Sequence, residues 1–344
     1  ALIIRNGPSL EALLDIARET RAKTVVWNRC YEPFQTKLDV RIESSLGKED
    51  IETYSFNGML LYEPGSIRTR VGASFRRFTP YWRACLASPA PREPVPAPAN
   101  LLPMEDDLGT QHLARVDTWR EAGKFSASTE GWVPGEKGAA AALSLFLERR
   151  CASYAADRDT VARDGTSRLS PHLHFGEISV NKIRTKLSLG RVSAHKEAQR
   201  AYLRQLGWRE YAYDVLFNNP DCLENPLRQL YVKFEWRHDP DSLYAWERGE
   251  TGYPLVDAGM RQLAAVGWMP NRVRMSAASF LVKHLLVSWQ AGAQWFWKRL
   301  MDADLANNVM GWQWVAGCGF DAAPVSYTHL RAHETLRNLV CRHL

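Results

Sequence analysis

The spacing of hydrophobic positions divides the chain into two regions of different structural type. In residues 10–20 the apolar side chains recur at the spacing of a helix, and the runs 24–27 and 51–56 have the composition and alternation of strands. Strands that alternate with helices are typical of a parallel α/β layer. We therefore predict an α/β layer, incomplete as a domain, for the N-terminal part.

Beyond residue 111 the pattern is helical. The predicted helices are 136–155, 176–188, 195–217, 240–248, 254–267, 271–287, 292–301 and 304–316. Six of the 18 prolines lie in residues 89–103, and such a segment is stiff and extended, which indicates a linker. The predicted organisation is a partial α/β domain (1–88), a linker (89–110), an all-α domain (111–325) and a tail (326–344).

Composition and charge narrow the class of protein. The chain has 344 residues with 45% hydrophobic and 24% charged residues, as in soluble globular proteins, and its net charge of +6 permits a polyanionic partner. The six cysteines are scattered singly, which argues against a zinc ribbon or a disulfide framework and favours the cytoplasm. No segment is long and apolar enough to span a membrane.

Tryptophan is the unusual component. Nine of the 13 tryptophans lie between residues 208 and 314. Core packing seldom needs so many indoles, whereas stacking on a base, a ring cofactor or another indole does. The helical region therefore has the composition of a site that binds flat aromatic groups.

Two segments carry groups suited to anions and bases. Residues 165–171 place three hydroxyls and Arg168 between a glycine and a proline, which suits a phosphate or pyrophosphate but also an ordinary capped loop. On the predicted helix 195–217, Tyr202, Gln205, Trp208 and Arg209 share one side. That side could stack on a base and hydrogen-bond its edge, or it could belong to a plain amphipathic helix.

Three further motifs follow. Residues 271–275 begin a helix after a proline, where free N–H groups and two arginines favour an anion, although Arg274 could equally pair with a core acid. Asp302 and Asp304 could accept ribose hydroxyls, or Asp304 could cap a helix; we predict no metal site, because neither His nor Cys lies nearby. The sequence Gly-Trp-Gln-Trp (311–314) alone would also suit core packing.

Taken together, these motifs resemble the photolyase/cryptochrome family. The resemblance runs from residue 1 to about residue 324, and its motifs are GTSRLSP (165–171), WRE (208–210), TGYPLVDAGMRQL (251–263), GWMPNRVRM (267–275), ASFLVKHLL (278–286), DADLANN (302–308) and GWQWVAG (311–317). The family implies an N-terminal α/β antenna domain and an all-α C-terminal domain that binds FAD. It also implies light-driven electron transfer from reduced FAD to a pyrimidine dimer flipped out of DNA.

The resemblance assigns a role to each motif residue. The predicted FAD-binding residues are Tyr154, Thr166, Ser167, Arg168, Leu169, Ser170, Tyr202, Arg209, Arg274, Asp302, Ala303, Asp304 and Asn308. Arg274 would pair with Asp302, and Asn308 would face flavin N5. Trp312, Trp289 and Trp236 match an electron relay that runs from the flavin to the surface. The predicted contacts with the lesion and the DNA are Arg158, Gln205, Trp208, Asn271, Arg272, Met275 and Trp314.

The resemblance also selects a subclass. Enzymes of this family that repair (6-4) photoproducts carry a histidine pair near residue 271, where this chain has Pro-Asn-Arg-Val-Arg-Met, so the cyclobutane-dimer enzyme is favoured. Gln205 stands where many dimer photolyases have Glu, and it offers a carbonyl oxygen without charge. Ultraviolet-damaged DNA is the predicted partner of a monomer, with no obligate protein partner. A second chromophore of the folate or deazaflavin type is a further expectation, in which Glu32 could contact a folate.

Two alternatives and one departure complete the prediction. A cryptochrome-like photosensor would use the same FAD pocket and tryptophan relay, and a flavin-free helical DNA-binding protein would use only the arginines. Residues 326–344 depart from the family pattern and resemble adapter read-through, so we predict a non-native tail rather than a divergent terminus. Without this tail the net charge falls from +6 to +4, because it holds three arginines and one glutamate.

Overall fold

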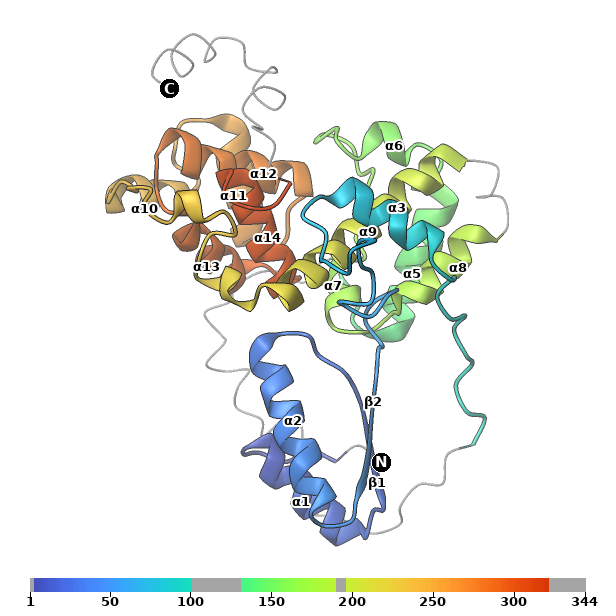
Figure 1. Ribbon diagram of the computed structural model, residues 1–344. Helices are drawn as coiled ribbons and strands as arrows, with labels where there is room; N and C mark the ends of the chain where they lie inside the picture. The colour runs from blue at the N-terminus through green and yellow to red at the C-terminus, as the bar shows by residue number, and fades with distance from the viewer. Residues whose placement is uncertain (1–2, 101–109, 111–130, 190–195, 322–344) are drawn as a thin grey trace. The chain divides into compact units, whose positions relative to one another are not determined.

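Contacts within the chain separate it into two compact units. The computed structural model describes residues 3–100, 110, 131–189 and 196–321 (Figure 1). The first unit comprises Ala1–Leu60 and Glu93–Ser126, and the second comprises Leu61–Arg92 and Ala127–Leu344. None of the described helices is long and apolar enough to cross a membrane.

The first unit contains the predicted α/β layer. Its elements are α1 (Ser9–Thr20), β1 (Thr24–Asn28), α2 (Pro33–Gly47) and β2 (Glu52–Phe56). The two strands pair in parallel, with Thr24 opposite Glu52 and Asn28 opposite Phe56, so α2 is the crossover that parallel pairing requires. Ala17, Ile42, Leu46 and Ile51 form the core under α1 and α2.

Helix α2 is absent from the sequence prediction, and its surface explains why. Phe34 and Val40 lie on this helix, yet they are 74% and 60% exposed. Apolar residues on the solvent side obscure the helical periodicity of apolar positions by which an amphipathic helix is recognised. The strands and α1, whose patterns are cleaner, are confirmed within a residue or two at each end.

The regular elements described in the second unit are all helices, which confirms the predicted fold class. They are α3 (Phe78–Ala87), α5 (Gly135–Leu145), α6 (Tyr154–Asp157), α7 (Ser170–His174), α8 (Val180–Ser188), α9 (Lys196–Asn218), α10 (Pro240–Arg248), α11 (Pro254–Val266), α12 (Asn271–Ser279), α13 (Trp289–Arg299) and α14 (Leu305–Ala316). In place of the single predicted helix 136–155, the structure has α5, a π-helical turn at Phe146–Arg150 and then α6. Likewise α12 continues into a π-helical turn at Phe280–His284. Short 3-10 turns cover Pro220–Leu223 and Gln229–Tyr231.

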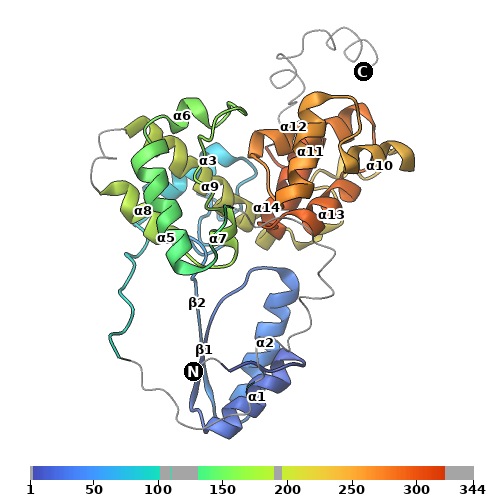
Figure 2. The same ribbon diagram turned by 180° about the vertical axis from the view of Figure 1, so that it is seen from behind.

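Helix α9 is the central element of the second unit. It packs against α14 on one side and against α3, α6 and α8 on the other, so it joins two groups of helices (Figures 1 and 2). One group is α5–α8 with α3, and the other is α10–α14. A site at the junction of the two groups can therefore take residues from α9 and from both groups.

Helix α3 belongs to the second unit, although the predicted boundary at residue 88 would place it in the first. Phe78, Tyr81 and Cys85 pack with Tyr211 and Val215 of α9 in one apolar cluster. A Cβ at Gly207 would lie 2.6 Å from the ring of Trp82, so the close approach of α3 requires this glycine. The contact-based boundary falls at residue 60 instead.

The other predicted boundaries are tested only in part. Residues 89–100 form neither helix nor strand, as expected of a linker, while residues 101–109 and 111–130 and the tail 326–344 lie outside the described residues. The predicted ranges stay predictions.

Two buried acids on α9 hold the start of the Leu61–Arg92 segment. Glu210 accepts hydrogen bonds from the backbone N–H of Leu61 at 2.8 Å and of Tyr62 at 3.1 Å, and Asp214 accepts from Gly65 N–H at 2.8 Å. Burial raises the pKa of Glu210 to about 7, even though Arg209 and these N–H groups favour the charged form. Desolvation also raises the pKa of Asp214.

The raised pKa of Glu210 makes stability depend on pH. Between about pH 4.5 and pH 7 the folded chain keeps a proton that the unfolded chain has lost, so stability is highest below this window and falls as pH rises through it. We expect wild type to lose roughly 2–3 kcal/mol more unfolding free energy than Glu210→Gln between about pH 5 and pH 8. Urea denaturation at both pH values measures this; equal losses would show that Glu210 is ionised in the fold.

Candidate active site

Two adjoining cavities lie where α9, α12, α14 and the segment around α6 and α7 meet. The larger has a volume of about 530 Å³ and the smaller about 280 Å³. They share residues from α9, α12 and α14, among them Gln205, Arg209, Arg274, Asp302 and Asp304. A ligand in one cavity would therefore contact the same walls as a ligand in the other.

The smaller cavity gathers the residues that the resemblance assigns to FAD. Its lining includes Tyr154, Thr166, Ser167, Arg168, Leu169, Ser170, Tyr202, Arg209, Arg274, Asp302 and Asp304. The remaining two, Ala303 and Asn308, line the larger cavity. Four stretches of the sequence, around 154–170, 202–209, 274 and 302–304, are thus brought to one place by the fold.

The hydroxyl-rich loop 165–170 is held open toward this cavity. Tyr202 donates from its hydroxyl to Ser167 Oγ at 2.9 Å, and Leu169 N–H donates to the same oxygen at 3.3 Å. Arg168 has a left-handed backbone with φ 53°, and its Nε donates to Asp164 at 3.1 Å. A non-glycine residue in that region is strained and persists where the surroundings hold it, as at ligand sites.

Trp268 is a lining residue of the smaller cavity that the sequence prediction omitted. Its indole N–H donates to Ser170 Oγ at 3.3 Å, and the Arg168 guanidinium lies 5.2 Å from its ring centre. Its place in the GWMPNRVRM motif was a signal in the sequence for this site. Nothing in local periodicity separates it from a core tryptophan.

Asp302 and Asp304 occupy distinct positions at the cavity wall. Asp304 caps α14 by accepting from Asn307 N–H at 2.9 Å, and its other oxygen accepts from the Tyr213 hydroxyl at 2.7 Å. The capping interpretation of Asp304 is therefore correct. Asp302 is 6% exposed and accepts from Arg274 Nη2 at 2.8 Å, as the resemblance implies.

Asp302 also supplies a test of whether a flavin fits. Its Oδ1 is buried and accepts no hydrogen bond from the described residues, although Asp302 lines both cavities. A buried carboxylate oxygen without a donor is costly, so a ligand that donates an N–H or O–H there would satisfy it. Flavin and ribityl groups offer such donors, and the residues present fit FAD.

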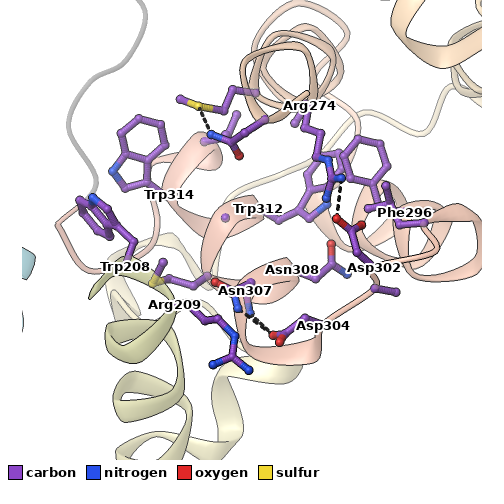
Figure 3. A pocket seen from close by; sticks show the side chains of 18 of the residues that line it. Trp208, Arg209, Arg274, Phe296, Asp302, Asp304, Asn307, Asn308, Trp312 and Trp314 are labelled. Carbon is purple, nitrogen blue, oxygen red and sulfur yellow. Dashed lines mark hydrogen bonds and ion pairs between the residues drawn. The ribbon is translucent and has the colours of Figure 1, made fainter. Parts of the chain in front are cut away.

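The larger cavity gathers the residues assigned to the lesion and the DNA. Its lining includes Arg158, Gln205, Trp208, Asn271, Arg272, Met275 and Trp314, which is the full predicted set. Trp312 and Asn308 line it as well. Figure 3 shows Trp208 and Trp314 on one side of the site, and Arg274, Asp302 and Phe296 on the other.

Trp208 has one ring face covered by α3. Its indole stacks on Phe78 with ring centres 3.7 Å apart and planes 12° from parallel. Phe78 is fully buried, and its backbone N–H donates to Asp321 at 3.1 Å. Phe78 therefore fixes the indole that lines the cavity, a role that the sequence prediction missed because the pair is far apart in sequence.

Exchange of Phe78 for leucine tests this support. Leucine keeps an apolar side chain but cannot stack, and an aromatic pair contributes about 0.5–1.5 kcal/mol beyond its buried area. We expect Phe78→Leu to weaken binding of dimer-containing DNA by about two- to tenfold. Fluorescence anisotropy measures this, with Leu86→Ala on the exposed side of α3 as the control; unchanged affinity in Phe78→Leu would contradict the role.

The predicted relay tryptophans differ in position. Trp312 is 2% exposed and lies 5.0 Å from the ring of Phe296. A Cβ at Gly292 would lie 2.1 Å from the Trp312 ring, so α13 can pack here only with glycine. Trp289 is buried on α13, and Trp236 is half-buried beside Phe234; neither lines either of the two cavities described above.

Other residues of the larger cavity were not predicted. They include Asn307, Phe296, Leu300, Met310 and Val315. Asn307 donates from Nδ2 to Asp304 at 2.9 Å and lines both cavities (Figure 3). Its position next to Asn308 in the DADLANN motif was the feature of the sequence that could have indicated this role.

Comparison with known proteins identifies the family. Residues 202–336 match the family profile described as the FAD binding domain of DNA photolyase, and residues 1–99 match that of DNA photolyase. A deoxyribodipyrimidine photo-lyase of Agrobacterium fabrum is 41% identical over 330 residues, which cover 94% of this chain and 68% of that protein. This chain belongs to the photolyase family. The helical unit is the FAD-binding domain of a photolyase, and the profile match extends into the segment 326–344 predicted to be non-native.

Two further relatives bear on the choice between repair and signalling. Cryptochrome-2 of Arabidopsis thaliana is 37% identical over 92% of this chain and 53% of its own length. The crystal structure of a bacterial class III photolyase from Agrobacterium tumefaciens has a TM-score of 0.86 at 40% identity, over 92% of this chain and 66% of that one. The chain thus spans about two thirds of the length of these photolyases and about half of the cryptochrome.

Proposed function

We propose that this chain splits cyclobutane pyrimidine dimers in DNA by light-driven electron transfer from bound, reduced FAD. The observation that carries the proposal is the larger cavity. Trp208 and Trp314 line it together with Trp312 and Asn308, and it adjoins the smaller cavity with its FAD-type lining. A dimer and the electron donor would therefore lie in adjoining cavities that share walls.

The chain's own residues would hold the cofactor at both ends. The hydroxyls of Ser167 and Ser170 and the Arg168 guanidinium suit the diphosphate, and Asp302 Oδ1 suits a donor on the flavin or ribityl chain. Reduced FAD, when bound, supplies an electron to the dimer on absorbing blue light and recovers it when the ring has opened. Asn308 donates its amide to Ala293 O at 2.9 Å, which fixes its carbonyl oxygen within the larger cavity.

The lesion end suits a flipped dimer. Two indoles provide flat apolar surfaces for the two pyrimidines, and Gln205 offers an uncharged carbonyl oxygen to a base N–H. Asn271 donates to Met275 Sδ at 3.5 Å, so both side chains stay at the start of α12. Arg158 and Arg272 would meet phosphates of the flanking backbone.

Trp312, Trp289 and Trp236 would carry electrons inward to keep the flavin reduced. Trp312 and Trp289 are both 2% exposed, whereas Trp236 is half-buried. A partly exposed residue at the outer end suits a path that takes electrons from a donor in solution.

The remaining proposals concern the state of the whole protein. We propose that the protein acts as a monomer without an obligate protein partner. The described cysteines are free thiols, which suits the reducing cytoplasm. We also propose that the first unit holds a second chromophore of the folate or deazaflavin type, with Glu32 as one contact.

Recovery of thymine absorbance tests the proposed function. Purified protein is reduced, mixed with ultraviolet-irradiated oligothymidine and exposed to blue light. We expect a light-dependent rise in thymine absorbance, because ring opening restores the pyrimidine double bonds. No rise from protein that contains FAD would contradict repair.

A photosensor role is the second candidate, because a cryptochrome matches at 37% identity over most of the chain. It predicts light-driven flavin reduction without repair. The two candidates separate when Trp208 and Trp314 are both replaced, since only repair needs the lesion surface.

A further inference from the structure

An ion pair joins two walls of the FAD site. Asp159 accepts from Arg272 through both oxygens: Nη2 lies 2.7 Å from Oδ2, and Nε lies 3.2 Å from Oδ1. This two-bond geometry is the strong form of an arginine–carboxylate contact. The partners are 113 residues apart in sequence.

Each partner belongs to a different part of the site. Asp159 follows α6 and lines the smaller cavity, on the same segment as the loop 165–170. Arg272 is in the first turn of α12 and lines the larger cavity. Helices α6 and α12 belong to the two helix groups that α9 joins (Figures 1 and 2).

The pair lies at the rim rather than in the core. The side chains of Asp159 and Arg272 are 46% and 25% exposed, although each borders a cavity. Arg158 adds a weaker contact, with its Nε 3.4 Å from Asp159 Oδ1. Partial burial opposes ionisation of Asp159, but the hydrogen bond from Arg272 and the charge of Arg158 lower its pKa overall, so the carboxylate is charged at neutral pH.

We propose that the Asp159–Arg272 ion pair is a latch that links the two walls of the FAD site and slows the escape of bound FAD. The proposal rests on FAD binding in the smaller cavity. Both the segment 154–170 and α12 line the smaller cavity, and the ion pair holds them together at the rim. The latch acts on retention of the cofactor and touches none of the reacting atoms.

Release of FAD in the dark tests the latch. The chain is loaded with FAD and diluted into an excess of an FAD-binding apoprotein as a trap, and release is followed by the change in flavin fluorescence. We expect Asp159→Asn to release FAD about three- to fivefold faster than wild type at low salt, which is the upper range for an exposed ion pair. At about 1 M salt, where screening acts within about 3 Å, this difference should shrink.

Asp157→Asn is the matched control. Asp157 pairs with Arg163 six residues away, so its ion pair stays within one wall. Its loss removes the same charge from the same segment without unlinking the walls. We therefore expect Asp157→Asn to release FAD at the wild-type rate.

A double-mutant cycle separates the effect of the ion pair on FAD release from the effects of the two residues taken singly. Arg272→Gln should also speed release, and Arg272→Gln with Asp159→Asn should be no faster than the faster single variant, because the same contact is lost. Arg272→Gln also keeps the test decisive if Asp159→Asn does not fold.

Three results would overturn the latch. They are release from Asp159→Asn at the wild-type rate, equal acceleration by Asp157→Asn, and a double variant whose acceleration is the product of the two single effects. FAD that never binds the wild-type chain would instead contradict the proposed function together with the latch, so the two failures are distinguishable.

Discussion

Replacement of both Trp208 and Trp314 by alanine is expected to weaken binding of dimer-containing DNA at least about 30-fold, since each indole that stacks on a base contributes about 1–3 kcal/mol. Both rings are fixed before DNA arrives: Trp208 stacks on Phe78, and the Trp314 indole N–H donates to Asp321 O at 3.1 Å. Binding therefore costs little conformational entropy of these two side chains. Anisotropy with an irradiated oligonucleotide measures the loss.

Two controls show whether the loss is specific to the lesion. Undamaged DNA should bind the double variant nearly as well as wild type, because its phosphates meet arginines that remain. Exchange of both tryptophans for phenylalanine should recover part of the affinity, since a ring still stacks. An equal loss for damaged and undamaged DNA would contradict the assignment of these indoles to the lesion.

Exchange of Arg274 for methionine is expected to have the largest effect on the fold around FAD. The side chain of Asp302 is 2% exposed, and Arg274 supplies its hydrogen bond at 2.8 Å. Removal of one partner of a buried pair costs about 3–5 kcal/mol, and because Arg274 is itself 21% exposed we expect about 2–4 kcal/mol of unfolding free energy. Urea denaturation of the FAD-free chain measures this loss.

The double variant Arg274→Met with Asp302→Asn provides the internal control, because it removes the stranded charge. It should regain much of the lost stability yet still bind FAD weakly. Arg248→Met, which breaks an exposed pair with Glu250, should leave stability nearly unchanged, because solvent screens that pair. Equal effects of Arg274→Met and Arg248→Met would show that Asp302 is hydrated in solution.

Local sequence pattern was sufficient for most helices and for the parallel strands. Helix α10 was predicted at its observed bounds, and α9, α11 and α14 within one or two residues. Helices α10 and α11 have a proline at their start, and Asp239 and Asp304 cap α10 and α14. Residues that a motif lists together, such as 166–170, also came together in one cavity. Both a motif and an apolar stripe depend only on residues that are close together in the sequence.

Contacts between distant segments could not be predicted in the same way. The stack of Phe78 on Trp208 joins residues on either side of the proline-rich stretch, and Asp159 meets Arg272 across 113 positions. Neither Phe78 nor Asp159 differs in type or spacing from an ordinary core or surface residue. Their roles depend on how α3 and α12 pack, which one sequence without homologues does not specify.

We infer that the two adjoining cavities bring bound FAD and a pyrimidine dimer together. Quenching of the fluorescence of bound, reduced FAD tests it most directly, because electron transfer to a nearby dimer competes with emission. We predict strong quenching by dimer-containing oligothymidine and none by the undamaged oligomer, under anaerobic conditions. Unchanged fluorescence while the damaged oligomer is bound would contradict the claim.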